Sequence, residues 1–330
     1  MNIPDFNLKD KLEKLNIKEA LNSVKDALGF EPQEIEEGIY IPSESSLKLA
    51  APNKSNYDDT EFDSPYTGNK KILMVCTEEQ YMTMANDRKF KTGNQPIEMM
   101  VPMLHFKKAG FDVDVFTATG KPVQIEDWAM PNEDDNVKAI YDEYKERLEK
   151  PNSLAELVKE DLAAMSDYAA IFIPGGHGAM LGLPDDKNLG EILRWVHKND
   201  LLTLVICHGP AALLAASLDN DDHNDNHNDN DANNNNSAST DNANMDFIFK
   251  GYDIVAFPDV MDKQMPKMGY LPGDMPWYFN EKLEDLGVTV TNKLASGHTH
   301  QDRKLISGDG PLAANELGKL AVKELLSTVK

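Results

Sequence analysis

Short apolar runs recur along this chain and are separated by segments with helical periodicity. Several of the runs are apolar almost throughout, which is typical of parallel strands that are covered on both faces of a sheet. The alternation predicts an α/β fold in which crossover helices connect the strands of a mostly parallel sheet. The seven expected strands cover residues 70–76, 112–118, 168–174, 201–207, 252–257, 288–292 and 304–307.

Two of the expected helices have clear start signals. Ser153 can cap a helix that extends to residue 165, in which apolar residues repeat every three or four positions. A last helix is expected over residues 311–328, because Pro311 suits a first helical turn and leucines repeat along one side. The apolar side of each helix predicts packing against the sheet.

The flanks and connections predict the domain organisation. Residues 1–45 are expected to form a helical N-terminal extension, although residues 31–69 contain four prolines and predict irregular structure. Residues 46–330 are expected to form one α/β domain, in which the polar, helical segment at about 120–165 makes a small cap. No internal repeat is visible, which disfavours a solenoid.

One segment, residues 217–246, consists mainly of Asn and Asp and has almost no large apolar side chains. Such a composition cannot bury enough surface to offset its ordering entropy, so it predicts a disordered insertion. His223 and His227 lie among its carboxylates. A weak metal site is one interpretation of these histidines, and the favoured one is a solvated repeat in which they are incidental.

Charge and cysteine content exclude several classes of protein. The net charge is −23, from 56 acidic and 33 basic residues, and eight of the Asp residues lie in the Asn/Asp segment. An acidic surface repels phosphate backbones, so nucleic-acid binding is disfavoured. Two cysteines cannot form a disulfide framework. The sequence has neither a signal-peptide pattern at its start nor an apolar run of ~20 residues, which predicts a cytoplasmic protein that does not enter a membrane.

Cys207 stands where an apolar strand turns into a helix. His208, Gly209 and Pro210 follow it, and glycine tolerates a strained turn while proline suits a first helical turn. A helix N-terminus favours a thiolate and can lower a cysteine pKa from ~8.5 into the range ~3.5 to 7.5. Cys207 is therefore a candidate nucleophile that is also liable to oxidation. Cys76 ends another core strand and is expected to be a structural residue.

Two further segments carry candidate chemistry. Gly175, Gly176 and His177 follow a buried strand, and successive glycines let backbone N–H groups converge on one point, as an oxyanion site requires. Their spacing does not match a phosphate-binding loop. Glu98 lies in the first turn of a helix that Pro96 opens, where the dipole favours a carboxylate. It is either an ordinary helix-start acid or a group that points toward the thiol from the carboxyl edge of the sheet.

Taken together, these segments are similar to the PfpI/ThiJ superfamily, and within it to the heat-shock branch of holding chaperones, glyoxalases III and protein deglycases. The resemblance covers the chain from about residue 40 onward, apart from the Asn/Asp segment. It implies a flavodoxin-like three-layer α/β sandwich, a homodimer and catalysis without a cofactor. The matching motifs are TGNQPIE (92–98), WAMP (128–131), YAAIFIPGGHGAMLGLP (168–184), CHGPAALLA (207–215), AFPDVMDKQMPKMGYLPG (256–273), WYF (277–279) and DRKLISGDGPLAANELGKLA (302–321).

The resemblance also implies roles for individual residues. Cys207 would be the nucleophile, with His208 beside it, Asp262 as the acidic partner and Glu98 hydrogen-bonded to the thiol. The backbone N–H groups of Gly176 and His208 would bind an oxyanion. Asp259 competes for the role of the acid, but the place of Asp262 in the motif matches the family's triad, and Asp259 follows a proline and suits a turn.

The family's bacterial members hold a metal near the active site with two histidines and a glutamate. The matching positions here are Lys107, Asp112 and Asn132. A protonated lysine cannot be a ligand, and Asp with Asn would hold zinc poorly, so no metal is expected there. His105 lies nearby and is expected to be an ordinary helix-surface or core residue.

The resulting hypothesis is a glutathione-independent glyoxalase, a D-lactate dehydratase that converts methylglyoxal to lactate through a hemithioacetal on Cys207. Deglycase activity on early glycation adducts of proteins could use the same nucleophile. An alternative is a stress-induced holding chaperone for unfolded proteins, for which the 15 methionines offer slight support. A third hypothesis, a cysteine peptidase or aminopeptidase, is disfavoured because a small-aldehyde pocket need not admit a polypeptide.

Overall fold

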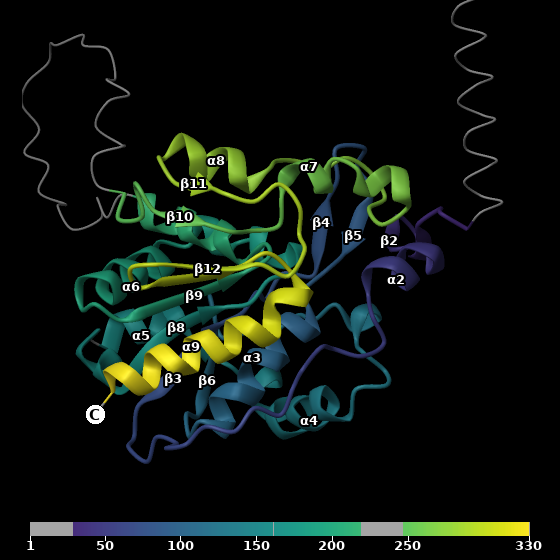
Figure 1. Cartoon of the computed structure of the whole chain (residues 1–330). Helices are drawn as coiled ribbons and strands as arrows, with labels where there is room; N and C mark the ends of the chain where they lie inside the picture. The colour runs from purple at the N-terminus through teal and green to yellow at the C-terminus, as the bar shows by residue number, and fades with distance from the viewer. Residues whose placement is uncertain (1–28, 161, 219–246, 330) are drawn as a thin grey trace, which may run out of the picture.

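The computed structural model describes residues 29–160, 162–218 and 247–329, and its centre is a seven-stranded sheet (Figure 1). The strand order is β12-β13-β9-β8-β3-β6-β7. All neighbouring pairs are parallel except β12 with β13. The predicted flavodoxin-like α/β fold with a mostly parallel sheet is therefore confirmed. The strands are β3 (Lys71–Val75), β6 (Val113–Thr117), β7 (Asn152–Ser153), β8 (Tyr168–Ile173), β9 (Leu202–Ile206), β12 (Thr299–Asp302) and β13 (Leu305–Gly308).

Helices cover both faces of this sheet and bury a separate core on each side. Alternate residues of a strand point to opposite faces, so Leu73 and Val75 of β3 join one core while Ile72 and Met74 join the other. The first core includes residues of α6 (Lys187–Lys198), of α8 (Phe279–Asp285) and of the 3-10 helix η5 (Gly209–Ser217). The second includes residues of α3 (Pro96–Lys108), α4 (Asp135–Glu149) and α9 (Ala314–Thr328).

Five of the seven expected strands lie in the main sheet, and the expectation for the other two was wrong in extent. Only β10 (Asp253–Ile254) and β11 (Thr289–Val290) form, and they pair with each other in a separate parallel sheet. The backbone that continues from β10 bonds elsewhere: Val255 donates to the Ser307 hydroxyl and Phe257 to the Cys207 carbonyl. The residues after β10 are therefore used to hold the turn at Cys207.

The expected helices form with interrupted ends. The helix predicted over residues 153–165 is α5 (Leu154–Glu160) followed by a 3-10 segment, η2 (Leu162–Asp167). The last helix begins with a 3-10 turn, η8 (Pro311–Ala313), before α9. Pro311 suits the first position of this turn, because proline has no backbone N–H and the first residues of a helix need no N–H donor.

The expectation of irregular structure over residues 31–69 was wrong for residues 33–50 and is confirmed for residues 51–69, which contain no helix or strand. The segment contains the helix α2 (Glu44–Ala50), whose start is capped by the Ser43 hydroxyl. It also contains two strands of a second sheet with the order β1-β2-β5-β4. The four strands of this second sheet are β1 (Gln33–Glu36), β2 (Ile39–Ile41), β4 (Tyr81–Thr83) and β5 (Lys89–Lys91), of which β1 and β2 lie within residues 31–69.

The remaining expectations on organisation stay predictions. The helices expected near the start, the disordered insertion, His223 and His227 lie largely or wholly outside the described residues. The segment expected to be a cap contains α4, whose buried Val137, Ile140 and Leu148 belong to the core beneath α3 and α9.

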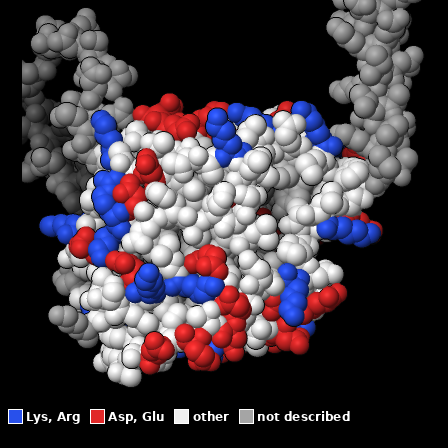
Figure 2. All heavy atoms as spheres, viewed as in Figure 1, with Lys and Arg blue, Asp and Glu red and all other residues white. Residues whose placement is uncertain are grey.

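The described residues contain no helix that is long and apolar enough to cross a bilayer. On the face shown in Figure 2, acidic and basic side chains are interspersed around uncharged areas. A short helix, α7 (Asp259–Asp262), and a 3-10 turn, η7 (Met265–Met268), follow β10 and bring Asp262 to the carboxyl edge of the main sheet.

Candidate active site

Cys207 occupies a strained turn at the carboxyl end of β9. Its φ is +59°, a left-handed conformation that residues with a side chain rarely adopt. Backbone hydrogen bonds hold it on both sides, because its N–H donates to the Gly308 carbonyl at 2.8 Å and its carbonyl accepts from Phe257 at 3.0 Å. The turn aims the side chain away from the strand ladder and into a cavity of about 70 Å³. Strain of this kind persists where the surroundings fix the backbone, and it is concentrated at functional sites.

Cys207, His208 and Asp262 form a connected chain of side chains. The Cys207 Sγ lies 3.2 Å from His208 Nδ1, and His208 Nε2 lies 2.9 Å from Asp262 Oδ2. Asp262 is 1% exposed, and burial alone would raise its pKa, but its interactions with His208 and His177 outweigh burial and lower the pKa to about 2. An ionised Asp262 requires a proton on His208 Nε2, which leaves Nδ1 free to accept the thiol proton.

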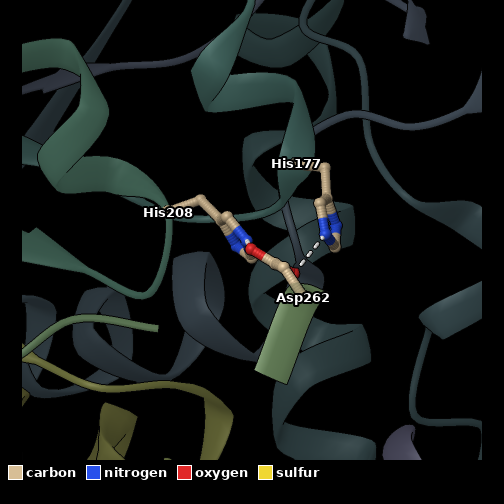
Figure 3. Close-up of side chains that lie close together, drawn as sticks. All are labelled: His177, His208 and Asp262. Atoms are coloured by element: carbon tan, nitrogen blue, oxygen red, sulfur yellow. Dashed lines mark hydrogen bonds and ion pairs between the residues drawn. The ribbon is translucent and has the colours of Figure 1, made fainter. Parts of the chain in front are cut away.

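His177 shares the same carboxylate. Its Nε2 lies 3.1 Å from Asp262 Oδ1, and its ring centroid lies 4.1 Å from that of His208 (Figure 3). Burial lowers the pKa of His177, but the hydrogen bond and charge of Asp262 outweigh burial and raise it. Burial and the neighbouring His177 lower the pKa of His208. The two rings therefore have different roles: His208 is poised as a neutral base, and His177 is the more readily protonated partner.

Glu98 lies beside the thiol, at the start of α3. The Gln95 side chain caps this helix by accepting the N–H of Glu98 at 2.8 Å. Neither carboxyl oxygen of Glu98 has a hydrogen-bond partner of good geometry among the described residues. Burial raises its pKa well above the ordinary value, and the neighbouring Cys207 opposes this shift. Glu98 is thus held as a neutral acid close to the nucleophile.

The glycine segment fits closely against these residues. A Cβ added at Gly175 would lie 2.3 Å from Glu98 Oε2 and 2.6 Å from the Cβ of Cys207. Gly176 has a φ of +97°, and a Cβ there would meet the Gly93 carbonyl at 2.3 Å. Glycine is therefore required at both positions for the loop to approach the thiol. The structure brings together all of the residues that the sequence nominated around Cys207.

The thiol differs from expectation in its protonation. Burial and the neighbouring Glu98 carboxyl raise the pKa of Cys207 well above its ordinary value, whereas the sequence predicted a lowered pKa. The expected helix is a short 3-10 helix, and its dipole competes with buried carboxyl groups that the local sequence does not reveal. The resting nucleophile is a thiol whose proton must pass to His208 during reaction. Cys76 is fully buried, and burial also raises the pKa of its thiol.

Asp259 has a structural role. Its two carboxyl oxygens accept the N–H groups of Asn280 at 3.3 Å and of Glu281 at 3.1 Å, in the first turn of α8. Burial raises its pKa to about 6. Asp259 thus bonds the start of α8, whereas His208 is bonded by Asp262.

Sequence reasoning missed Glu126, a buried carboxyl that lines the same cavity as Cys207 and Glu98. Glu126 directly precedes the DWAMP segment (127–131). Its place beside this motif is the sequence feature that could have pointed to a role in the site. The ring of Tyr270 is a second unpredicted wall of the cavity.

Three metal-capable side chains lie close together within the described part of the chain: His177, His208 and Asp262, with ligand atoms within 4.8 Å of one another. Both oxygens of Asp262 already bond the two imidazoles. The arrangement therefore suits a carboxylate that bridges two histidines.

The positions that correspond to the family's metal ligands form other contacts. Lys107 pairs with Glu143, and Asp112 pairs with Arg147 at 2.7 Å. The backbone carbonyl of Asn132 accepts from Lys138 at 3.1 Å. That no metal binds there stays a prediction. His105 is a buried core residue whose Nε2 lies 2.8 Å from Asn315 Oδ1.

The sequence is similar to those of known proteins. A model of the DJ-1/PfpI family matches residues 90–223. A protein of Pseudomonas aeruginosa (strain UCBPP-PA14), named protein/nucleic acid deglycase HchA, is 42% identical over 296 residues, which cover 89% of this chain and 94% of the relative. The chain belongs to the DJ-1/PfpI family. The Escherichia coli (strain K12) protein/nucleic acid deglycase 1 is 41% identical over 292 residues, which cover 88% of this chain and 94% of that protein.

Two solved structures have the same fold. The glyoxalase III of Candida albicans aligns with a TM-score of 0.56 at 20% identity, over 79% of this chain and 98% of the other. The rapid encystment protein of Francisella tularensis aligns with a TM-score of 0.60 at 20% identity, over 78% and 99%. The family model and the deglycase relatives confirm the DJ-1/PfpI resemblance that the sequence motifs predicted.

Proposed function

We propose that this DJ-1/PfpI protein is a glutathione-independent glyoxalase, which converts methylglyoxal to lactate through a hemithioacetal on Cys207. The observation that carries the proposal is the 3.2 Å contact between Cys207 Sγ and His208 Nδ1, inside a cavity of about 70 Å³. A cavity of this size suits a small aldehyde. The names of its deglycase relatives support the same substrate class, because early glycation adducts are products of such aldehydes.

The first step is addition of sulfur to the aldehyde carbon. The thiol proton passes to His208 Nδ1, whose tautomer is fixed by Asp262, and the sulfur attacks the carbon. Glu98, which burial keeps protonated, donates its proton to the oxygen of the former aldehyde. The backbone N–H groups of Gly176 and His208 would stabilise the charge that develops on this oxygen.

The second step moves hydrogen between two carbons. Glu98, now ionised, removes the proton from the carbon bonded to sulfur, and the second carbonyl oxygen takes up a proton to give an enediol. The same carboxyl returns its proton to the neighbouring carbon while the first oxygen releases a proton, which gives a thioester of lactate. Water then cleaves the thioester: its hydroxyl leaves in lactic acid, its other proton restores Glu98, and protonated His208 returns a proton to the Cys207 sulfur. The overall change is addition of one water to methylglyoxal.

The decisive experiment measures lactate formed from methylglyoxal by the wild type and by Cys207→Ala, with Cys76→Ala as the matched control. We expect no lactate above background from Cys207→Ala and near wild-type turnover from Cys76→Ala. Full conversion by Cys207→Ala would refute the proposal.

Deglycase activity is a second use of the same site. Hemithioacetal and aminocarbinol adducts on proteins are chemically close to the proposed intermediate. Direct repair requires that adducts disappear faster than they dissociate spontaneously. Adduct loss that never exceeds the dissociation rate would show that removal of free aldehyde accounts for it. The relatives' name also includes nucleic acids, and the same comparison applies to adducts on bases.

A holding chaperone is the alternative from another class, and one observation favours it. A hollow of about 360 Å³ adjoins the Cys207 cavity, and it is lined largely by apolar residues that include the exposed Leu49 and Leu312. Exposed apolar surface suits unfolded chains. Suppression of aggregation that survives Cys207→Ala would separate this activity from catalysis. The peptidase hypothesis ranks third because the cavity is too small for a polypeptide. The homodimer and the cytoplasmic location stay predictions.

A further inference from the structure

Two carboxyl groups, from Glu98 and Glu126, line the small cavity that contains the Cys207 thiol. Glu126 is 1% exposed and directly precedes the 3-10 helix η1 (Asp127–Ala129), whereas Glu98 lies in α3. Its place is fixed by backbone pairing, since its N–H donates to the Asn94 carbonyl at 3.0 Å and Asn94 donates to the Gln124 carbonyl at 2.7 Å. This pairing inserts the Glu126 side chain beside the loop that starts α3.

The Glu126 carboxyl is held by a hydrogen bond and forms no ion pair with a lysine or arginine of the described residues. Oε1 accepts the hydroxyl of Thr92 at 2.8 Å. Burial raises its pKa to about 7, the charge of His177 and the Thr92 hydrogen bond oppose this shift, and the nearby Asp127 adds to it. The other titratable groups that line the cavity are Cys207, Glu98, Tyr270, His177 and His208, and the charge of Glu126 acts on the first four of them. Near neutral pH, Glu126 can therefore both give and take a proton.

The proposed reaction needs such a group in addition to Glu98. When Glu98 removes the proton from the carbon bonded to sulfur, that electron pair forms the carbon–carbon double bond and the second carbonyl becomes an oxyanion. This oxygen requires a proton. When Glu98 then returns its proton to the second carbon, the hydroxyl on the first carbon must lose one. Glu98 is occupied at carbon in both events, and His208 carries the thiol proton.

We propose that Glu126 is a second catalytic carboxyl, which donates a proton to the second carbonyl oxygen of the substrate and takes one from the hydroxyl of the carbon bonded to sulfur. Both transfers together leave Glu126 protonated, as it began, and leave the enediol converted to the thioester. The proposal rests on the proposed glyoxalase function. It assigns one carboxyl to the carbons and the other to the oxygens of a 2-oxoaldehyde, so a simple aldehyde would use only Cys207, His208 and Glu98.

The test compares Glu126→Gln, Glu126→Asp and Thr92→Val with the wild type. Lactate formation gives kcat, and mass spectrometry of protein quenched with methylglyoxal gives the fraction of Cys207 that carries the adduct. For Glu126→Gln we expect kcat to fall by about 10²-fold, the low end of general acid–base effects. The Cys207 adduct should accumulate in this variant, because addition does not need Glu126. Glu126→Asp should recover part of kcat, and Thr92→Val should retain most of it.

Each outcome decides between the proposals. Wild-type kcat in Glu126→Gln would overturn the role of Glu126 and leave the glyoxalase function intact. Loss of both turnover and the Cys207 adduct in Glu126→Gln and Glu126→Asp would also overturn it, because Glu126 would then be needed only to build the cavity. If the wild type itself forms no lactate, the proposed function fails and this role fails with it.

Discussion

Replacement of Asp262 by Asn tests the bridged histidine pair most directly. Asp262 accepts from His208 at 2.9 Å and from His177 at 3.1 Å, and both bonds involve an ionised carboxylate. Asparagine has the same shape but one acceptor and one donor. Its Nδ2 must face one of the two imidazole N–H groups, so one ring has to change tautomer. If His208 changes, Nδ1 carries the proton and cannot accept the thiol proton of Cys207.

The expected magnitude follows from this change. A positioned general base contributes ~10²- to 10⁴-fold, so kcat/KM for methylglyoxal should fall by at least ~10²-fold, about 2.7 kcal/mol of transition-state stabilisation. Stability also changes. The pKa of Asp262 is about 2 in the folded protein, against 3.8 for an unperturbed aspartate in the unfolded chain. Ionised Asp262 therefore contributes roughly 2 kcal/mol to the free energy of unfolding above pH 4, and this contribution is lost as the pH falls toward 2.

The assay is lactate formation at several substrate concentrations, together with urea unfolding at pH 7. The matched control is Asp259→Asn, three residues away, which weakens the bonds to the start of α8 and should cost about 1 kcal/mol of stability with little change in turnover. The reasoning is refuted if Asp262→Asn retains turnover within about threefold of the wild type. It is also refuted if the Asp259 control loses as much activity as Asp262→Asn.

Three further outcomes are expected. With a neutral alkylating reagent, Cys207 should react much faster than Cys76, because Cys207 lines a cavity while Cys76 is fully enclosed and both thiols have raised pKa values; equal rates by mass spectrometry would contradict this. Gly175→Ala should abolish lactate formation and lower the urea midpoint, since its Cβ would lie 2.3 Å from Glu98 Oε2, and an active variant would show that the loop can move away. The folded protein binds the Glu126 proton more tightly than the unfolded chain does, so the contribution of Glu126 to stability falls as the pH rises from 4.5 to 7. Glu126→Gln should therefore flatten the dependence of the free energy of unfolding on pH in that window. An unchanged slope would count against the raised pKa.

The sequence predicted best those features that depend on neighbouring residues. The continuous apolar runs of β3, β8 and β9 were sufficient because strands buried on both faces need no alternation. The turn at Cys207 was also visible, since strand, glycine and proline signals adjoin there. The short strands β1 and β2 were missed because their residues are mostly exposed or half-buried and so lack an apolar run.

Features that depend on contacts between distant segments could not be predicted in the same way. The preference for Asp262 over Asp259 came from the family resemblance, because both acids lie in one short segment and only the fold decides which meets His208. Glu126 was missed because its backbone pairs with Asn94, more than thirty positions earlier. The pKa of Cys207 was predicted in the wrong direction for a related reason: burial comes from packing, and dipole arguments alone omit it.

The left-handed backbone of Cys207 has a consequence for how this protein can change over time. At a φ of +59°, a side chain costs of order 1 kcal/mol that glycine would not. Cys207→Gly should therefore relieve the backbone strain and abolish activity. Selection for stability and selection for the thiol act in opposite directions at this position. Persistence of cysteine here would consequently mark a lineage in which the chemistry is still in use, and a glycine would be an early sign of its loss.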